Sequence, residues 1–289
     1  RLLDRISLVD RQGKPILQAS TQEAVRRDVL IVKQFIHYLD QASDYQTAFQ
    51  NFFQLLQKSK DEMWDDELID LHDFFSKLAK ILGTGTFLWE EFSRLQFKEL
   101  RPIFANDDAL KRTYSHKQLE TIIDGILNSD PFTSSEEKVK TLNVFKNKEL
   151  FRLDLKHLVF NDNTFEDFSK DLCLLAEVSL VRLYEIGYDY LESKYGTPIL
   201  DGDKISGALL ALGKFGGQEL GYASDLELVF VYEGTGQTEG VKNTISNQEF
   251  FNKLVQWVNK SWSTKSDGIF EIDWRLRPYG EKGSWSVSL

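Results

Sequence analysis

The sequence holds a single cysteine, Cys173, in 289 residues. One cysteine excludes an intramolecular disulfide, so a reducing compartment such as the cytosol is the expected setting. Proline is also scarce, with five residues, which favours long uninterrupted helices. No apolar run approaches the roughly twenty residues that a bilayer-spanning helix needs, so we expect no membrane partner.

Positive charge is in short supply as well. The chain has 45 acidic and 35 basic residues, a formal net charge of -10. This balance disfavours non-specific binding to nucleic acid, whose phosphates require a basic surface, so nucleic acid is not an expected partner. The four histidines show no metal-ligand spacing, and none lies beyond His157. No Ser-His-Asp or Cys-His arrangement is therefore predicted in the last third of the chain.

What the sequence does contain is enough apolar material for a core, with 42% hydrophobic and 13% aromatic residues. The first residues, RLLDRISLVD, lack an initiator methionine and an apolar signal-peptide stretch. The last residues, GSWSVSL, stop in what resembles a strand. We expect the chain to be a fragment of a longer protein.

Residues from about 20 to 195 carry the helical period of apolar side chains. The first predicted face comprises Val25, Val29, Val32, Ile36 and Leu39. The second comprises Leu68, Leu71, Phe75, Leu78 and Leu82, and it stops at Gly83. The third, in Phe168–Tyr190, comprises Leu172, Leu175, Ser179, Leu183 and Ile186. We expect these faces to form the core of a helical region.

Another helix is predicted to begin after Ser134, because Glu137 follows three residues later as in a capping box. Its basic residues form either a contact for an acidic partner or, more commonly, a solvated helix face. They are Lys138, Lys140, Lys146, Lys148, Arg152 and Lys156.

The helical pattern of apolar residues ends near Gly196, where a predicted loop over residues 196–204 suggests a domain boundary. A short buried strand is predicted over 205–213, a second strand over 226–232, and a flexible loop over 233–240. An amphipathic helix follows over 247–262, with Ser246 and Glu249 as its capping box. Residues 268–277 alternate with period two and predict a third strand. The predicted fold class is α+β, with a mainly helical region over 1–200 and a small α/β domain over 201–289.

Two acids, Asp225 and Glu227, stand at the head of the second predicted strand. On a strand they share one face, while Leu226 faces the core. If the third strand lies alongside, Asp273 joins them on that face. Three carboxylates in one patch repel one another unless a divalent cation lies among them. Oxygen ligands of this kind suit Mg²⁺ or Mn²⁺.

The residues around the acids suggest a phosphate site. Gly216 and Gly217 let the backbone approach a ligand closely, and Ser224 offers a hydroxyl. Arg275 and Arg277 supply positive charge for phosphates. Acids, metal and phosphates together predict phosphoryl or nucleotidyl transfer.

Each of these features alone has a commoner explanation. A double glycine is usually a turn, acids alternating on a strand are usually a solvated face, and the two arginines can pair with Asp273 as surface salt bridges. The Trp residues at 257, 262, 274 and 285 are expected in the domain core. What is specific is the order: strand, double glycine, acid-x-acid strand, helix, and a third acid on a strand.

That order resembles the polymerase-β-like nucleotidyltransferases, and one branch closely: the bifunctional glutamine synthetase adenylyltransferase/adenylyl-removing enzymes. The segments that carry the resemblance are ALGKFGGQELGYASDLELVFVY and SDGIFEIDWRLRPYGEKGSWSVS, within residues 205–289. KELFRLDLKHLVF and the Phe168–Tyr190 helix are similar, more loosely, to the helical region that precedes such a domain. PYGEKG and SNQEFFNKLVQ resemble the first, adenylyl-removing domain of these enzymes more than the second.

The resemblance implies a function and a set of site residues. Such enzymes add AMP from ATP to a tyrosine of glutamine synthetase, or remove it with phosphate to give ADP, under control of a PII signalling protein and glutamine. It implies Asp225, Glu227 and Asp273 as metal ligands and Gly216 and Gly217 as a phosphate cradle. Asp273 is also the residue expected to orient the nucleophile.

The sequence departs from the family pattern at three positions: Glu227 replaces the usual Asp, Gly221 the usual Asn, and Trp274 the usual Met. A longer side chain at Glu227 shifts the carboxylate, and a shift near 1 Å can cost roughly a hundredfold in rate. Two alternatives therefore stay open. One is a catalytically degenerate domain that senses nucleotide or binds a partner, and the other is a nucleotidyltransferase for another substrate.

Overall fold

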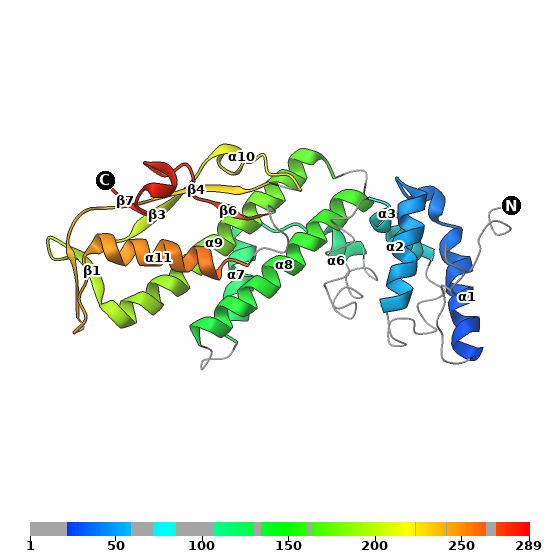
Figure 1. The fold of residues 1–289 in the computed structure, drawn as a ribbon, viewed down its shortest axis with the longest axis horizontal. Helices are drawn as coiled ribbons and strands as arrows, with labels where there is room; N and C mark the ends of the chain where they lie inside the picture. Colours follow the sequence, from blue (N-terminus) through cyan, green and yellow to red (C-terminus); the bar gives the residue numbers. More distant parts are fainter. Residues whose placement is uncertain are drawn as a thin grey trace. The chain divides into compact units, whose positions relative to one another are not determined.

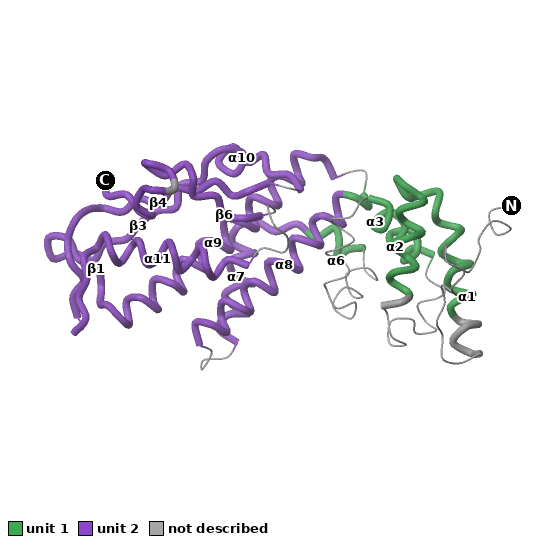
Figure 2. Tube along the Cα trace, in the orientation of Figure 1, with its two compact units in different colours: residues 1–112, 158–161 green, residues 113–157, 162–289 purple. Residues whose placement is uncertain are grey.

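A computed structural model of the chain describes residues 22–58, 72–84, 107–129, 134–160, 163–222, 224–240, 242–263 and 270–289. The chain forms two compact units (Figure 2). One comprises residues 1–112 and 158–161, and the other comprises residues 113–157 and 162–289. The predicted domain limit near residue 200 stays a prediction. Residues on both sides of it, 162–200 and 201–289, belong to the same compact unit.

The first unit is helical. It contains α1 (Gln22–Ile36), η2 (Leu39–Gln41), α2 (Tyr45–Lys58), α3 (His72–Leu82) and α6 (Asp107–Lys111). Its core is aromatic, because the Phe35 ring stacks on the Phe52 ring at a centroid distance of 3.8 Å and both side chains are fully buried.

The first predicted face is confirmed in part: Val32 and Leu39 are buried, whereas Val29 and Ile36 are only half-buried, and the side chain of Val25 lies outside the described residues. Ile31 and Phe35, which the prediction left out, are fully buried. The aromatic stacking of Phe35 sets the rotation of this helix. The end of α3 before Gly83 is confirmed, and Leu68 and Leu71 lie outside the described residues.

The longer described helices of the second unit are α7 (His116–Leu127), α8 (Ser135–Val159), α9 (Phe165–Tyr195) and α11 (Asn247–Ser261). The predicted buried face of α9 is confirmed, and Cys173 lies in the core beside it. The capping box before α8 is confirmed too, with the Ser134 amide donating to Glu137 at 2.9 Å and the Glu137 amide donating to Ser134 Oγ at 3.2 Å. At α11 the Glu249 amide donates to Ser246 Oγ at 3.1 Å, but the Glu249 carboxylate turns to Lys253 at 3.3 Å.

The solvated basic face expected on α8 was wrong for half of its residues. Lys146 is buried and donates to the carbonyl oxygen of Ser263 at 2.5 Å, with its ammonium group 3.8 Å from the centre of the Trp262 ring. Arg152 and Lys156 are buried as well and pair with Glu149 and Asp171, each at 2.8 Å. These cations are therefore compensated inside the fold.

Two small sheets complete the second unit. In the first, β1 (Thr197–Leu200) pairs antiparallel with β2 (Asp203–Lys204) and β5 (Gln237–Glu239). In the second, β4 (Leu226–Tyr232) is central. It pairs antiparallel with β3 (Gly207–Ala211) and parallel with both β6 (Ile272–Asp273) and β7 (Val287–Ser288). The fold is α+β, as predicted.

Three details of the strand prediction were wrong. Residues 196–204 form the β1–β2 hairpin, whose turn residues Asp201 and Gly202 have φ of 52° and 93°. The expected loop over 233–240 contains β5. The strand β3 is not buried, because it lies at the sheet edge and leaves Leu210 45% exposed.

Helices α9 and α11 cover one face of the second sheet (Figure 1). The β4 side chains on that face, Phe230 and Tyr232, contact Phe251 of α11 with ring centroids 5.6 and 4.8 Å apart. The opposite face of β4 carries Glu227, Val229 and Val231, all half-buried. Among the described residues, no helix has both the length and the apolar character needed to cross a bilayer.

Close packing of α9 on α11 predicts a contrast between two helical glycines. A Cβ at Gly187 would lie 2.5 Å from Trp257 Cε3 and 3.0 Å from Leu254 Cδ1, whereas a Cβ at Gly125 would meet nothing within 4 Å. We expect Gly187→Ala to lower the free energy of unfolding by about 1–3 kcal/mol. Gly125→Ala should raise it by about 0.5–1 kcal/mol, since alanine favours the helix. Urea unfolding of both variants checks this, and equal effects would contradict the packing described.

Candidate active site

The site lies on the face of β4 that the helices leave open. Burial alternates along the strand, so that Leu226 and Leu228 enter the core while Glu227 stays half-buried on the other face. Asp225 lies two residues before Glu227, so it is on the same face, and it is also half-buried. Because β4 pairs along both edges, its backbone holds these side chains in fixed positions.

The third acid is in register with the second. In the parallel pairing of β4 and β6, Leu226 is opposite Ile272 and Glu227 is opposite Asp273. Ile272 is buried, as Leu226 is, so Glu227 and Asp273 lie on the same open face. The structure thus brings the predicted acids to one end of one sheet.

Asp225 is the least compensated of the three. Within the described part of the chain, its Oδ1 atom is buried and accepts no hydrogen bond. Burial raises the pKa of this carboxyl above its ordinary value, and the nearby charges of Asp273 and Glu271 raise it further. Arg275 and Lys214 act in the opposite direction but do not cancel the effect. A carboxylate in this position favours an added positive charge.

Asp273, in contrast, is fully engaged by Arg275. The Arg275 amide donates to Oδ1 at 2.8 Å, Nε lies 2.9 Å from both oxygens, and Nη2 donates to Oδ2 at 2.6 Å. These hydrogen bonds lower the pKa of Asp273. Its side chain is 10% exposed, whereas that of Arg275 is 69% exposed. The salt bridge considered from the sequence is therefore present.

Glu227 lies against a glycine that the sequence analysis passed over. A Cβ at Gly213 would fall 1.3 Å from Glu227 Oε2, and Gly213 has a φ of +52°. The Leu212 amide donates to the Glu227 carbonyl oxygen at 2.9 Å, which fixes the turn beside the carboxylate. The backbone conformation favours glycine here, and a Cβ would also displace the Glu227 carboxylate. The signal was available as the first glycine of GKFGG.

The double glycine ends a single helical turn, α10 (Gly213–Gly216). The amides of Gly216 and Gly217 donate to the carbonyl oxygens of Leu212 and Gly213, both at 2.9 Å. A Cβ at Gly216 would lie 2.5 Å from the Ala211 carbonyl oxygen, so glycine is needed for packing. The phosphate role predicted for the pair stays a prediction.

Ser224 has a structural partner close by. Its buried Oγ accepts a hydrogen bond from the Gly221 amide at 2.9 Å, which closes the turn before the acids. A Cβ at Gly221 would make only ordinary contacts, the nearest at 3.5 Å from Phe165. The space at this position therefore accepts a larger residue.

The predicted third strand is shorter than expected. It ends at Asp273, and the chain turns at residues 275–276. Pro278 and Tyr279, which has a φ of 66°, then keep the chain from continuing as a strand. Trp274 is buried as predicted and donates to Asn259 Oδ1 at 2.9 Å. Leu276, expected in the core, is 54% exposed.

The turn also moves Arg277 away from the position expected for it. Arg277 is buried, donates to the Trp274 carbonyl oxygen at 2.8 Å and stacks over the Trp285 ring at 4.6 Å. Its cation is used in packing, and a direct role with phosphates stays a prediction. Arg275 is the exposed arginine of the two.

A pocket of about 560 Å³ opens beside the acids. Its lining comprises Asp225, Asn259, Glu271, Ile272, Asp273, Trp274, Arg275, Arg277 and Trp285. Glu227 lies outside this lining, next to Asp273 in register. The pocket combines two of the three acids, an exposed guanidinium and two indole rings, which is a suitable environment for an anionic, aromatic ligand.

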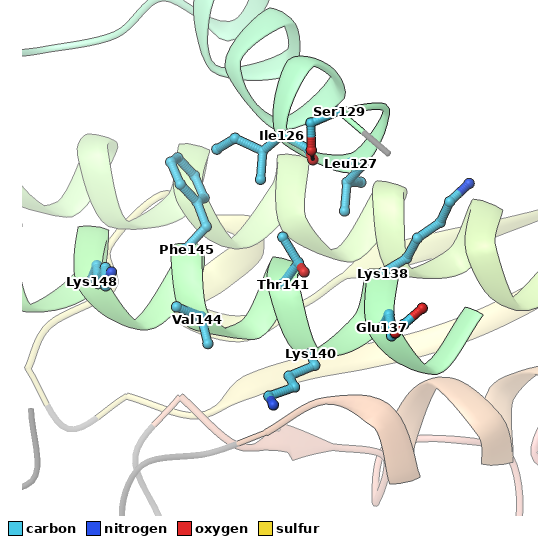
Figure 3. A pocket seen from close by; sticks show the side chains of 10 residues that line it. All are labelled: Ile126, Leu127, Ser129, Glu137, Lys138, Lys140, Thr141, Val144, Phe145 and Lys148. Atoms are coloured by element: carbon cyan, nitrogen blue, oxygen red, sulfur yellow. Dashed lines mark hydrogen bonds between the residues drawn. The ribbon is translucent and has the colours of Figure 1, made fainter. Parts of the chain in front are cut away.

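A second pocket, of about 580 Å³, lies between α7 and α8 (Figure 3). Ile126 and Leu127 face Phe145 and Thr141 there, and the Lys140 side chain extends away from them (Figure 3). Its one carboxylate, Glu137, is occupied in capping α8. This pocket lacks the acid cluster and is not the candidate active site.

The acid cluster partly fits a divalent cation. Carboxylate oxygens are suitable ligands, and the buried, unpartnered Oδ1 of Asp225 is an atom that a cation would satisfy. No three His, Cys, Asp or Glu side chains are arranged to hold a metal ion in the described parts of the chain, however. Asp273 is turned to Arg275 and Glu227 to Gly213, so the metal role of the three acids stays a prediction.

Comparison with known proteins agrees with the geometry. The family model described as glutamate-ammonia ligase adenylyltransferase matches residues 75–289 of the chain, a stretch that contains all three acids. The chain belongs to the glutamate-ammonia ligase adenylyltransferase family. The match begins well before the α/β part, so it includes most of α3 and the described helices that follow.

Three curated relatives carry the name bifunctional glutamine synthetase adenylyltransferase/adenylyl-removing enzyme. The chain is 32% identical to the one from Alteromonas mediterranea over 52% of this chain and 15% of the relative. It is 28% identical to the one from Vibrio parahaemolyticus, over 78% and 23% respectively. For Shewanella woodyi the identity is 31%, over 73% and 22%. The chain therefore spans less than a quarter of the length of these relatives.

The opposite environments of Asp225 and Asp273 predict opposite effects on the stability of this family member. Asp225→Asn should raise the free energy of unfolding at neutral pH, because the ionised carboxylate costs stability once the pH rises through its raised pKa. Asp273→Asn should lower it, by up to about 1 kcal/mol, because the Arg275 pair is lost.

Urea unfolding at several pH values measures both effects. The gain from Asp225→Asn should vanish below the ordinary aspartate pKa of about 3.9, where the unfolded carboxyl is also protonated. The stabilisation by Asp273 should persist to lower pH and disappear as the pH falls through its lowered pKa. A loss of stability in Asp225→Asn at neutral pH would contradict the description of Asp225.

Proposed function

We propose that this chain carries a metal-dependent nucleotidyl transfer site that controls glutamine synthetase by removing or adding AMP on a tyrosine. The substrate follows from the names of the relatives and the proposed chemistry from the site. One observation carries the proposal most directly. Asp225 Oδ1 is buried without a hydrogen bond, beside the register pair of Glu227 and Asp273, in the segment that matches the family.

The proposed metal ligands are Asp225, Glu227 and Asp273. A bound Mg²⁺ or Mn²⁺ supplies positive charge for the phosphate oxygens and for the charge that develops during transfer. Asp225 and Glu227 are held by the paired backbone of β4, and Asp273 by β6. The raised pKa of Asp225 and the mutual repulsion of the acids both support a site that takes up cations.

The remaining groups of the site bind and orient the nucleotide in this proposal. Arg275 and Lys214 bring positive charge close to Asp225, and Arg275 lines the pocket. Trp274 and Trp285 form the pocket wall on which an adenine ring can lie. Gly213 keeps the space beside the Glu227 carboxylate open.

The reaction exchanges one bond at the α-phosphorus. In removal, an oxygen of inorganic phosphate forms a bond to the α-phosphorus of adenylyl-tyrosine, the bond to the tyrosine oxygen breaks, and the products are ADP and tyrosine. In the addition reaction, the tyrosine oxygen forms a bond to the α-phosphorus of ATP, and pyrophosphate leaves. We favour removal, because PYGEKG and SNQEFFNKLVQ resemble the adenylyl-removing domain.

The setting of this activity is also part of the proposal. Glutamine synthetase is the expected protein substrate, a PII signalling protein the expected regulator, and the cytoplasm the expected compartment. The single cysteine, buried in α9, fits a reducing environment.

A catalytically degenerate domain is the second candidate. Two observations favour it: Glu227 in place of aspartate, and the turning of Glu227 and Asp273 toward Gly213 and Arg275. Such a domain would bind nucleotide or a regulatory partner without transferring AMP. Activity measurements separate the two candidates.

Asp225→Asn tests the proposal. The variant should lose AMP removal from adenylylated glutamine synthetase, and AMP addition from ATP, by roughly a hundredfold or more, because several kcal/mol of charge stabilisation depend on the metal site. Release of radiolabelled ADP measures removal, and incorporation of radiolabelled AMP into glutamine synthetase measures addition. Glu233→Gln is the control, because this exposed acid follows the other end of β4 and should leave both rates unchanged.

Two results would contradict the active-site assignment. One is an Asp225→Asn variant as active as the unmodified chain. The other is an unmodified chain with no detectable transfer in either direction that still binds ATP or a PII protein, which would establish the degenerate domain instead.

A further inference from the structure

The contact between Arg275 and Asp273 is more complete than a surface salt bridge needs to be. Both carboxylate oxygens of Asp273 accept hydrogen bonds from the Arg275 side chain, and Oδ1 also accepts from the Arg275 amide. The acid is 10% exposed and the arginine 69% exposed. The guanidinium therefore covers a recessed carboxylate from the solvent side.

This arrangement places a positive charge where the proposed metal would need a ligand. The guanidinium occupies both oxygens of Asp273, so an incoming cation competes with Arg275 for that carboxylate. Asp225 offers an unpartnered buried oxygen on the same side of the pocket, and Glu227 is in register with Asp273. Asp273 is thus the acid whose release would complete a set of three.

We propose that Arg275 is a built-in counter-cation of the site: it holds Asp273 when no metal is bound, gives way to a divalent cation, and then binds a phosphate of the nucleotide. This inference rests on the proposed function. Arg275 suits both partners, because a guanidinium forms the same paired hydrogen bonds with carboxylate and phosphate. It lines the pocket, so it can change partner by rotation of its side chain.

The exposure of Arg275 gives the exchange a path. The side chain of Arg275 is 69% exposed, so the guanidinium can leave Asp273 through solvent and need not cross the protein interior. Arg277 does not share this freedom, because it is buried, hydrogen-bonded to Trp274 and stacked on Trp285. The two arginines of RLRP therefore have different roles, one in exchange and one in packing.

The exchange couples metal to nucleotide. A cation that takes Asp273 frees Arg275 for phosphate, and a nucleotide that holds Arg275 leaves Asp273 to the cation. By linkage each ligand then raises the affinity for the other by the same factor. The coupling depends on a single side chain and should disappear with it.

Manganese binding to the full chain tests this without any assay of activity. Mn²⁺ is titrated alone and with ADP, using electron paramagnetic resonance for free Mn²⁺, and a titration without protein corrects for the Mn²⁺ that ADP itself binds. Arg275→Gln should bind Mn²⁺ about two- to fivefold more tightly than the unmodified chain without ADP, the range expected for loss of an exposed ion-pair competitor. ADP should tighten Mn²⁺ binding to the unmodified chain and do so less in the variant.

Two further variants keep the result specific. Lys282→Gln removes one exposed positive charge from the turn beyond Pro278 and should not change Mn²⁺ affinity beyond the small effect of net charge. Arg275→Lys keeps the charge but loses the paired hydrogen bonds, so its Mn²⁺ affinity should be intermediate. Thermal unfolding verifies that each variant is folded.

The outcomes separate this inference from the proposed function. Tighter Mn²⁺ binding in Arg275→Gln, or binding in that variant alone, supports the exchange. Equal or weaker binding in Arg275→Gln, with clear binding by the unmodified chain, overturns the exchange and leaves the proposed metal site standing. No Mn²⁺ binding by either protein overturns both.

Discussion

The candidate site depends on the placement of a carboxylate, Asp225, directly before a strand that is paired on both edges. The strand β4 holds the acid by its backbone, and the core behind it holds the strand. Its buried Oδ1 accepts no hydrogen bond in the part of the chain that the structure describes. Burial and the neighbouring acids also raise the pKa of Asp225, an environment that is common among functional carboxylates.

The neighbours of Asp225 follow from this constraint. Register puts Glu227 next to Asp273, and repulsion among the acids requires compensation from outside β4. The compensation is unequal, because Arg275 binds Asp273 and the Oδ1 atom of Asp225 accepts no hydrogen bond from the described residues. Our proposals of cation uptake and of transfer of Arg275 to phosphate both start from that inequality.

Much of this arrangement could be predicted from the sequence, because it depends on local pattern. Period two placed Asp225 and Glu227 on one face, and helical spacing identified the core face of α9. Contacts between distant segments could not be predicted in this way. The turn after Asp273 buries Arg277 under Trp285, and the stacking of Phe35 on a ring from another helix rotates α1. The Asp201–Gly202 pair is a typical hairpin turn, so the β1–β2 hairpin could have been predicted where a loop was expected.

The central claim is that Asp225, Glu227 and Asp273 share a bound divalent cation. A crystal structure of the chain with Mn²⁺ and ADP tests it most directly, because the anomalous signal of manganese locates the ion independently of the protein atoms. The account predicts a peak within ligating distance of Asp225, Glu227 and Asp273, with Arg275 turned to a phosphate. A manganese peak elsewhere, with Arg275 still bound to Asp273, would contradict it.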